Sequence, residues 1–126
     1  LSRRYKKASP EEKMRMGQKD ARYLIYAITK TAAGRNETML ETAERLKDVE
    51  AGGAVNVKEL YSMAEEDVYA WYSLCYGGHF PDEKALNNSR GYRKQLYFVF
   101  LEKAGDSFIR RLAARIRALW QLYELP

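Results

Sequence analysis

Residues 15–30 read RMGQKDARYLIYAITK, and the spacing of their apolar side chains is that of an amphipathic α-helix. At about 100° per residue, one side of this helix carries Met14, Ala21, Leu24, Ile25, Ile28 and Ala32. The opposite side carries five residues that we call the basic ridge: Arg15, Lys19, Arg22, Tyr26 and Lys30. At ~1.5 Å per residue the ridge is roughly 22 Å long. The stretch therefore predicts a helical fold in which one long helix presents positive charge to solvent.

The basic ridge contains no acid of its own. A helix face that is merely solvated usually has acids three or four residues away from its cations. Glu11, Glu12 and Asp20 lie before the ridge or on another side of the helix. Because its charges would repel one another, we expect an external anion to lie along the ridge. Phosphates of a nucleic acid fit this requirement.

Capping residues set the expected limits of the N-terminal helices. Ser9 and Pro10 begin the first helix, which is expected to run to about Ala33 and to end at Gly34. A shorter helix is expected to begin at Asn36 and to end before Gly52-Gly53.

A third helix is expected after Asn56, and one of its faces is predicted to be buried. This face comprises Val57, Leu60, Tyr61, Ala64, Val68, Trp71, Tyr72 and Cys75.

The segment from Asp82 to Asn88 predicts one or two helical turns, with an interruption at Ser89-Arg90-Gly91. The helix expected at Tyr92–Lys103 is apolar on more than one side. Two explanations are open: contact with another subunit, or a central position in the fold.

The last helix is expected to bury a seam and to end near the C-terminus. The seam comprises Phe108, Leu112, Ile116, Leu119 and Tyr123. Trp120 and Leu122 flank this seam, and we expect self-association through this region.

These elements predict an all-α protein, a bundle of four or five helices with a long basic N-terminal helix and a short basic arm. The expected divisions are a flexible arm at 1–9, the basic helix at 10–34 and a bundle domain at 35–126. Charge is segregated in the same way. Residues 1–35 carry a net charge of +7, residues 36–83 carry −8 and residues 84–126 carry +6. The fold is therefore expected to present separate basic and acidic surfaces.

Two further basic clusters extend the predicted phosphate-binding surface. The arm supplies Arg3, Arg4, Lys6 and Lys7, and the last helix supplies Arg110, Arg111, Arg115 and Arg117. Arg90, Arg93 and Lys94 are expected to add to them. Arginine suits forked phosphate contacts. An alternative for the last helix is pairing with Glu65, Glu66 and Asp67 of a neighbouring subunit.

Catalysis, cofactors and metals have little support in the sequence. His79, the single histidine, lies in a Gly/Pro loop, and Cys75, the single cysteine, falls on the predicted buried seam. Gly52-Gly53 and Gly77-Gly78 lack the Lys-Ser/Thr that a phosphate-binding loop requires. We therefore expect a protein that is not an enzyme, with no cofactor and no metal. No charge-free apolar run is long enough to predict a membrane span.

The N-terminal run Ser2-Arg3-Arg4-Tyr5, followed by an amphipathic basic helix and a compact helical domain, resembles the major coat proteins of filamentous archaeal viruses. The resemblance covers about the first 30 residues and the general layout. It implies an N-terminal helical arm that wraps double-stranded DNA in an A-like form, and a C-terminal bundle that forms the shell of a virion. The acidic second block and the arginine-rich last helix depart from that pattern.

The function expected from the sequence is that of a structural protein that coats double-stranded DNA through backbone contacts and assembles as a homo- or hetero-oligomer. One alternative is an accessory helical module, cytoplasmic or nucleoid-associated, that binds single-stranded nucleic acid. Another is a basic peripheral membrane protein whose first helix lies flat on the bilayer.

Overall fold

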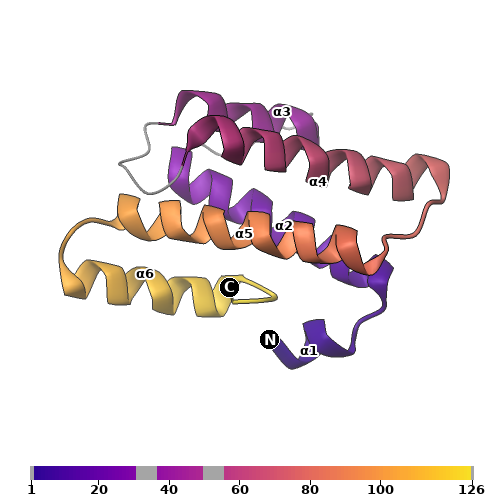
Figure 1. The fold of residues 1–126 in the computed structure, drawn as a ribbon. Coiled ribbons are helices and arrows are strands. Elements are labelled where there is room, and N and C mark those ends of the chain that lie inside the picture. Colours follow the sequence, from indigo (N-terminus) through magenta and orange to yellow (C-terminus); the bar gives the residue numbers. More distant parts are fainter. Residues whose placement is uncertain (1, 31–36, 50–55, 126) are drawn as a thin grey trace.

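The computed structural model describes residues 2–30, 37–49 and 56–125, with the backbone alone for residues 2 and 3. Within these residues all regular structure is helical (Figure 1). The elements are α1 (Ser2–Lys7), α2 (Pro10–Thr29), α3 (Met39–Glu44), the 3₁₀ turn η1 (Arg45–Asp48), α4 (Val57–Gly77), α5 (Glu83–Ala104) and α6 (Phe108–Gln121). The all-α prediction is confirmed, although the described helices are more numerous than the four or five expected.

Helix α5 lies at the centre of the fold. It packs against α2 and α4, and α6 runs along its other side (Figure 1). Its buried apolar residues therefore point in several directions: Tyr92, Leu96, Tyr97, Val99, Phe100 and Leu101. A central position thus accounts for the apolar character of Tyr92–Lys103 without a second subunit. The interruption expected at Ser89-Arg90-Gly91 is wrong, because α5 is continuous from Glu83.

Helix α2 begins as predicted and ends early. The Ser9 hydroxyl accepts a hydrogen bond from the Glu12 amide at 3.2 Å, and Pro10 occupies the first helical position. The helix ends at Thr29 because Lys30 adopts a left-handed conformation with φ of 54°. The end expected near Ala33 is therefore wrong. Residues 31–36, which include the expected boundary at 34, lie outside the described residues.

The face predicted to be buried is confirmed on α2, but it is confirmed only in part on α4. On α2 the described seam residues are all buried: Met14, Ala21, Leu24, Ile25 and Ile28. On α4 the seam is buried at Leu60, Ala64 and Val68, whereas Cys75 is exposed. The expectation for Cys75 is wrong because side chains near the C-terminal end of α4 extend beyond the core, and Tyr76 is exposed there as well.

The segment expected to be a flexible arm is instead the short helix α1, docked on the body of the protein. Tyr5 is 4% exposed, and its hydroxyl accepts a hydrogen bond from Nη2 of Arg93 at 3.2 Å. Lys13 lies over the Tyr5 ring, with Nζ 5.6 Å from the centroid. One buried tyrosine therefore holds α1 against α2 and α5.

Helix α6 is rotated relative to the prediction. It packs against the rest of the protein through two small buried residues, Ala114 and Ala118. Four residues of the predicted core seam are exposed instead: Phe108, Leu112, Ile116 and Leu119. The prediction for this seam is wrong because alanine lets α6 approach α5 closely, and the large apolar side chains are left pointing away from it.

Candidate nucleic-acid interface

The basic ridge lies on the solvent side of α2. Arg15, Lys19 and Lys30 are exposed, and Arg22 and Tyr26 are half-buried. Arg15 forms an ion pair with Glu12 one turn earlier. The prediction that no acid compensates the ridge is therefore wrong at its N-terminal end.

Tyrosine rings accompany two of the ridge cations. Nε of Arg22 donates a hydrogen bond to the Tyr26 hydroxyl, and the guanidinium lies 5.6 Å from the centre of that ring. Nζ of Lys19 lies 5.9 Å from the ring of Tyr123, and the guanidinium of Arg4 lies 5.7 Å from the same ring. Such contacts orient a cation without neutralising its charge. Tyr123 thus brings one cation of α1 and one of α2 to the same place.

Asp20 fixes the C-terminal segment that carries Tyr123. Its two carboxylate oxygens accept hydrogen bonds from the amides of Tyr123 and Glu124, at 2.8 and 3.0 Å. Burial raises the pKa of Asp20 to about 6, although these two amide bonds act in the opposite direction. This carboxylate therefore serves as a buried anchor and does not belong to the basic surface.

Three cations from different parts of the chain meet in a hollow of about 320 Å³. Lys30 follows α2, Lys103 lies in the last turn of α5, and Arg117 lies in α6. Tyr23, Ala27, Phe100 and Ala104 complete the lining, which includes no carboxylate. Among the described residues none of the three cations forms an ion pair. We call this site the cationic hollow.

The cationic hollow combines two predicted residues with one that no pattern in the sequence indicates. Lys30 and Arg117 belong to the predicted set, 87 positions apart in the chain. Lys103 follows Glu102 in the last turn of its helix, where a lysine is ordinary. Lys103 reaches the cationic hollow only because α5 packs beside α2 and α6.

The other α6 arginines are exposed but do not converge with Arg117. Nε of Arg111 donates to the carbonyl oxygen of Gly105 at 2.9 Å, and Nη2 lies 3.8 Å from Asp106. Arg110 and Arg115 are exposed elsewhere on the helix. The α6 arginines are therefore spread around the helix, and only Arg117 lines the cationic hollow.

The structure describes most, but not all, of the side chains of the predicted N-terminal cations. Arg4, Lys6 and Lys7 are exposed on α1, and the side chain of Arg3 lies outside the described residues. Arg93, expected to extend the basic surface, is 1% exposed. Its guanidinium donates to Ser89 at 2.6 Å and to Glu124 at 2.9 Å, so it belongs to the interior.

Within the described residues no group of three or more His, Cys, Asp or Glu side chains is placed to hold a metal ion. None of the described helices combines the length and apolarity needed to cross a membrane. No protein-family model matches the chain, and no match was found among curated proteins or among solved structures. The resemblance to coat proteins of filamentous archaeal viruses therefore stays a prediction.

Proposed function

We propose that this protein is a structural nucleic-acid-binding protein that contacts the phosphate backbone of double-stranded DNA and self-assembles, as a coat protein of a filamentous virus would. In this proposal the helical bundle places its basic side, α2 with the cationic hollow, on the nucleic acid. The proposed partner is a duplex, and the proposed location is a virion.

The observation that carries the proposal is the cationic hollow. Lys30, Lys103 and Arg117 stand around one depression with no carboxylate among its lining residues. Holding three like charges close together is unfavourable unless an anion lies between them. A phosphate group has the charge and the acceptor oxygens to occupy such a position.

The surrounding cations support a contact longer than one phosphate. Lys19 and Arg4 meet over Tyr123, and Lys6 and Lys7 are exposed on α1. Lysine and arginine side chains on the solvent side of helices suit backbone contacts, which position a protein on DNA without reading its sequence. We therefore expect binding with little sequence preference.

The alternatives differ in support. A single-strand binder would expose aromatic rings beside its cations. Phe108 and Trp120 are exposed on α6 beside its arginines, so the comparison of single-strand and duplex affinity below decides between the two functions. A bilayer-bound first helix would need its apolar side free, and that side of α2 is buried in the core.

The proposal is tested by measuring duplex binding as a function of salt. The variant Lys30→Gln/Lys103→Gln/Arg117→Gln removes the charge of the cationic hollow. Each phosphate contact contributes a slope of about −0.9 in log K against log salt. We expect weaker binding and a salt slope that is shallower by about 1, the contribution of the one phosphate assigned to the hollow.

A matched control removes three exposed lysines from η1, α4 and the first turn of α5: Lys47→Gln/Lys58→Gln/Lys84→Gln. Both variants lower the net charge by three. A difference between their DNA affinities must therefore come from the positions of the removed charges. Equal effects of the two variants would contradict the proposed site. A stronger affinity for short single strands than for duplexes would favour the accessory-module alternative.

A further inference from the structure

Helix α6 leaves its whole apolar side uncovered. Its large apolar residues are between 45% and 79% exposed: Phe108, Ile109, Leu112, Ile116, Leu119 and Trp120. At about 100° per residue they form one continuous side of the helix, opposite the alanines that contact α5. An exposed apolar surface of this extent marks a contact with a partner.

The charges beside this side limit what can cover it. Arg111 and Arg115 lie on one flank of the apolar side, and Arg110 and Arg117 lie on the other. Helix α6 contains no acid. If two copies of α6 packed against each other, arginines would face arginines with no carboxylate from either helix, which is unfavourable. The partner surface that packs against this side of α6 should therefore be partly apolar and should carry acidic residues.

Helix α4 of the same chain presents a surface of that kind. Exposed residues recur every three or four positions along its outer side: Glu59, Ser62, Glu66, Tyr69, Ser73 and Tyr76. Tyr69 is 52% and Tyr76 86% exposed. Over its length α4 carries four acids and one lysine, whereas α6 carries four arginines. The two surfaces are complementary in charge, and each bears large exposed rings.

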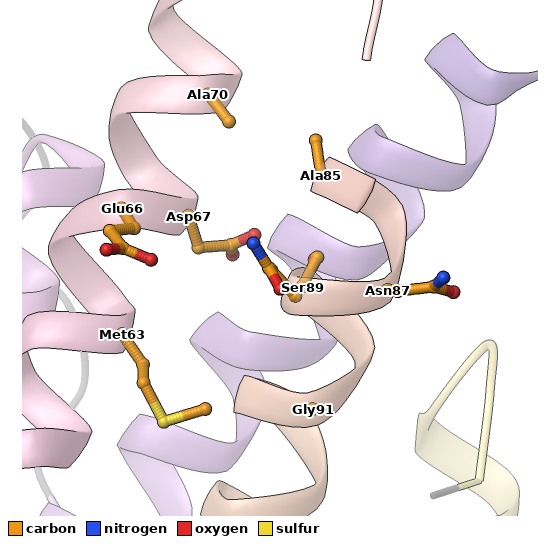
Figure 2. A pocket seen from close by; sticks show the side chains of 9 residues that line it. Met63, Glu66, Asp67, Ala70, Ala85, Asn87, Ser89 and Gly91 are labelled. Atoms are coloured by element: carbon orange, nitrogen blue, oxygen red, sulfur yellow. The ribbon is translucent and has the colours of Figure 1, made fainter. Parts of the chain in front are cut away.

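A cavity beside this side of α4 is lined by two of the acids of that helix. It has a volume of about 280 Å³ and lies between α4 and α5, and Figure 2 shows Glu66 and Asp67 on the α4 side of it. Asp67 is 5% exposed; its Oδ2 accepts a hydrogen bond from Gln18 at 2.7 Å, and its Oδ1 has no partner among the described residues. Of these two carboxylates only that of Glu66 is exposed, so Glu66 is the acceptor here for a guanidinium of another molecule.

The two surfaces cannot meet within one chain. Helices α4 and α6 lie on opposite sides of α5 (Figure 1). If α6 of one copy covers α4 of a second copy, the second copy still has a free α6 and the first a free α4. Such a contact is heterologous, and it propagates into an open filament or closes into a ring.

We propose that the apolar, arginine-flanked side of α6 packs against the acidic, tyrosine-bearing side of α4 in a second copy of this chain, so that copies join head to tail. This inference rests on the self-assembly part of the proposed function and names its two surfaces. It does not require nucleic acid, and the test is carried out without any. Failure of the head-to-tail contact is therefore distinguishable from failure of phosphate binding.

Two variants of the full chain test the contact. Leu112→Asp/Ile116→Asp disables the α6 surface, and Glu66→Arg/Tyr69→Arg disables the α4 surface. All four positions are exposed, so each variant should fold, as circular dichroism and thermal unfolding will check. For Lys94→Glu, a control at an exposed position of α5, we expect association like that of the wild-type chain. The mass in solution is measured by sedimentation velocity over a range of protein concentrations.

We expect the mass of the wild-type chain to rise with concentration. Each variant alone should stay monomeric, with a dissociation constant raised by about tenfold or more. The decisive sample is an equimolar mixture of the two variants. One variant retains a working α4 and the other a working α6, so the mixture should form a dimer and nothing larger. The mixture also shows that each variant keeps its other surface intact.

Other results would overturn the proposal. If the variant with the altered α4 associates like the wild-type chain while the variant with the altered α6 does not, α6 packs against a second α6 or against another surface, and not against α4. If the mixture stays monomeric, the two surfaces do not meet. If the wild-type chain is monomeric at every concentration and binds vesicles of anionic phospholipid through α6, that helix docks on a lipid surface.

Discussion

Gly17 of α2 lies directly against the guanidinium of Arg93 in α5, so close that a Cβ atom at position 17 would overlap Nη1 of the arginine. Arg93 is the largest of the fully buried side chains. It donates hydrogen bonds to Ser89, Tyr5 and Glu124, and therefore joins α5, α1 and the C-terminal segment. The absence of a side chain at Gly17 is what makes room for this junction.

Substituting Gly17→Ala should destabilise the protein even though alanine is the better helix former. Overpacking a filled interior costs about 1–3 kcal/mol, which exceeds the gain of about 0.5–1 kcal/mol from replacing glycine in a helix. The free energy of unfolding, measured with a chemical denaturant, is expected to fall. Gly91→Ala is the control, because no described atom lies within 4 Å of a Cβ at that helical position. It should gain stability, and a gain at both positions would contradict the described packing.

Substituting Arg93→Met keeps much of the side-chain volume and removes the charge. Among the described residues Glu124 then keeps only Arg90, an exposed partner at 3.2 Å, so the loss should be smaller than the roughly 3–5 kcal/mol that leaving a buried charge unpaired costs. Tyr5→Phe removes only one acceptor of the same guanidinium and should cost about 1 kcal/mol. Denaturant unfolding of both variants and of the double variant measures the coupling. An Arg93→Met protein as stable as the wild-type chain would show that Arg93 is not part of the interior.

Local signals in the sequence predicted the helical class and several helix boundaries. The spacing of Leu24, Ile25 and Ile28 identifies the buried side of α2 because a helix that packs on one side repeats every 3.6 residues. Ser9 and Asn56 identify helix starts because their side chains accept hydrogen bonds from amides in the first turn.

The wrong predictions concern residues whose burial depends on how one helix packs against another. Arg93 reads as a surface cation, because nothing near it in the sequence shows that Tyr5 and Glu124, 88 and 31 residues away, will surround it. The seam of α6 reads as core because its apolar period is strong, yet the contact with α5 is made by Ala114 and Ala118. The cationic hollow was predicted only in part for the same reason, since Lys103 gains its position from the packing of three helices.

Asp20 should make stability depend on pH between about 4 and 6. Burial raises its pKa to about 6 in the folded protein, whereas an unfolded aspartate titrates near 3.9. In this window the folded protein binds more protons than the unfolded chain, so the contribution of Asp20 to stability falls as pH rises and is constant above the window. The free energy of unfolding of the wild-type chain, minus that of Asp20→Asn, should fall by roughly 1 to 3 kcal/mol from pH 4 to pH 6.5. Other carboxylates cancel in this difference, and a difference that rises with pH would contradict the assignment.

The start of α5 depends on a cap that the start of α6 lacks. Oδ1 of Asp82 accepts a hydrogen bond from the amide of Ala85 at 2.7 Å, whereas Ser107 precedes α6 without any side-chain cap bond. Replacing a working cap by alanine costs about 1 kcal/mol, and Asp82 also places a negative charge at the positive end of the central helix. We therefore expect Asp82→Ala to lower the free energy of unfolding by about 1 kcal/mol and Ser107→Ala to change it little. Equal losses in the two variants, measured by denaturant unfolding at neutral pH, would mean that Ser107 caps α6 in solution, which would also change the exposed first turn on which the α6 contact depends.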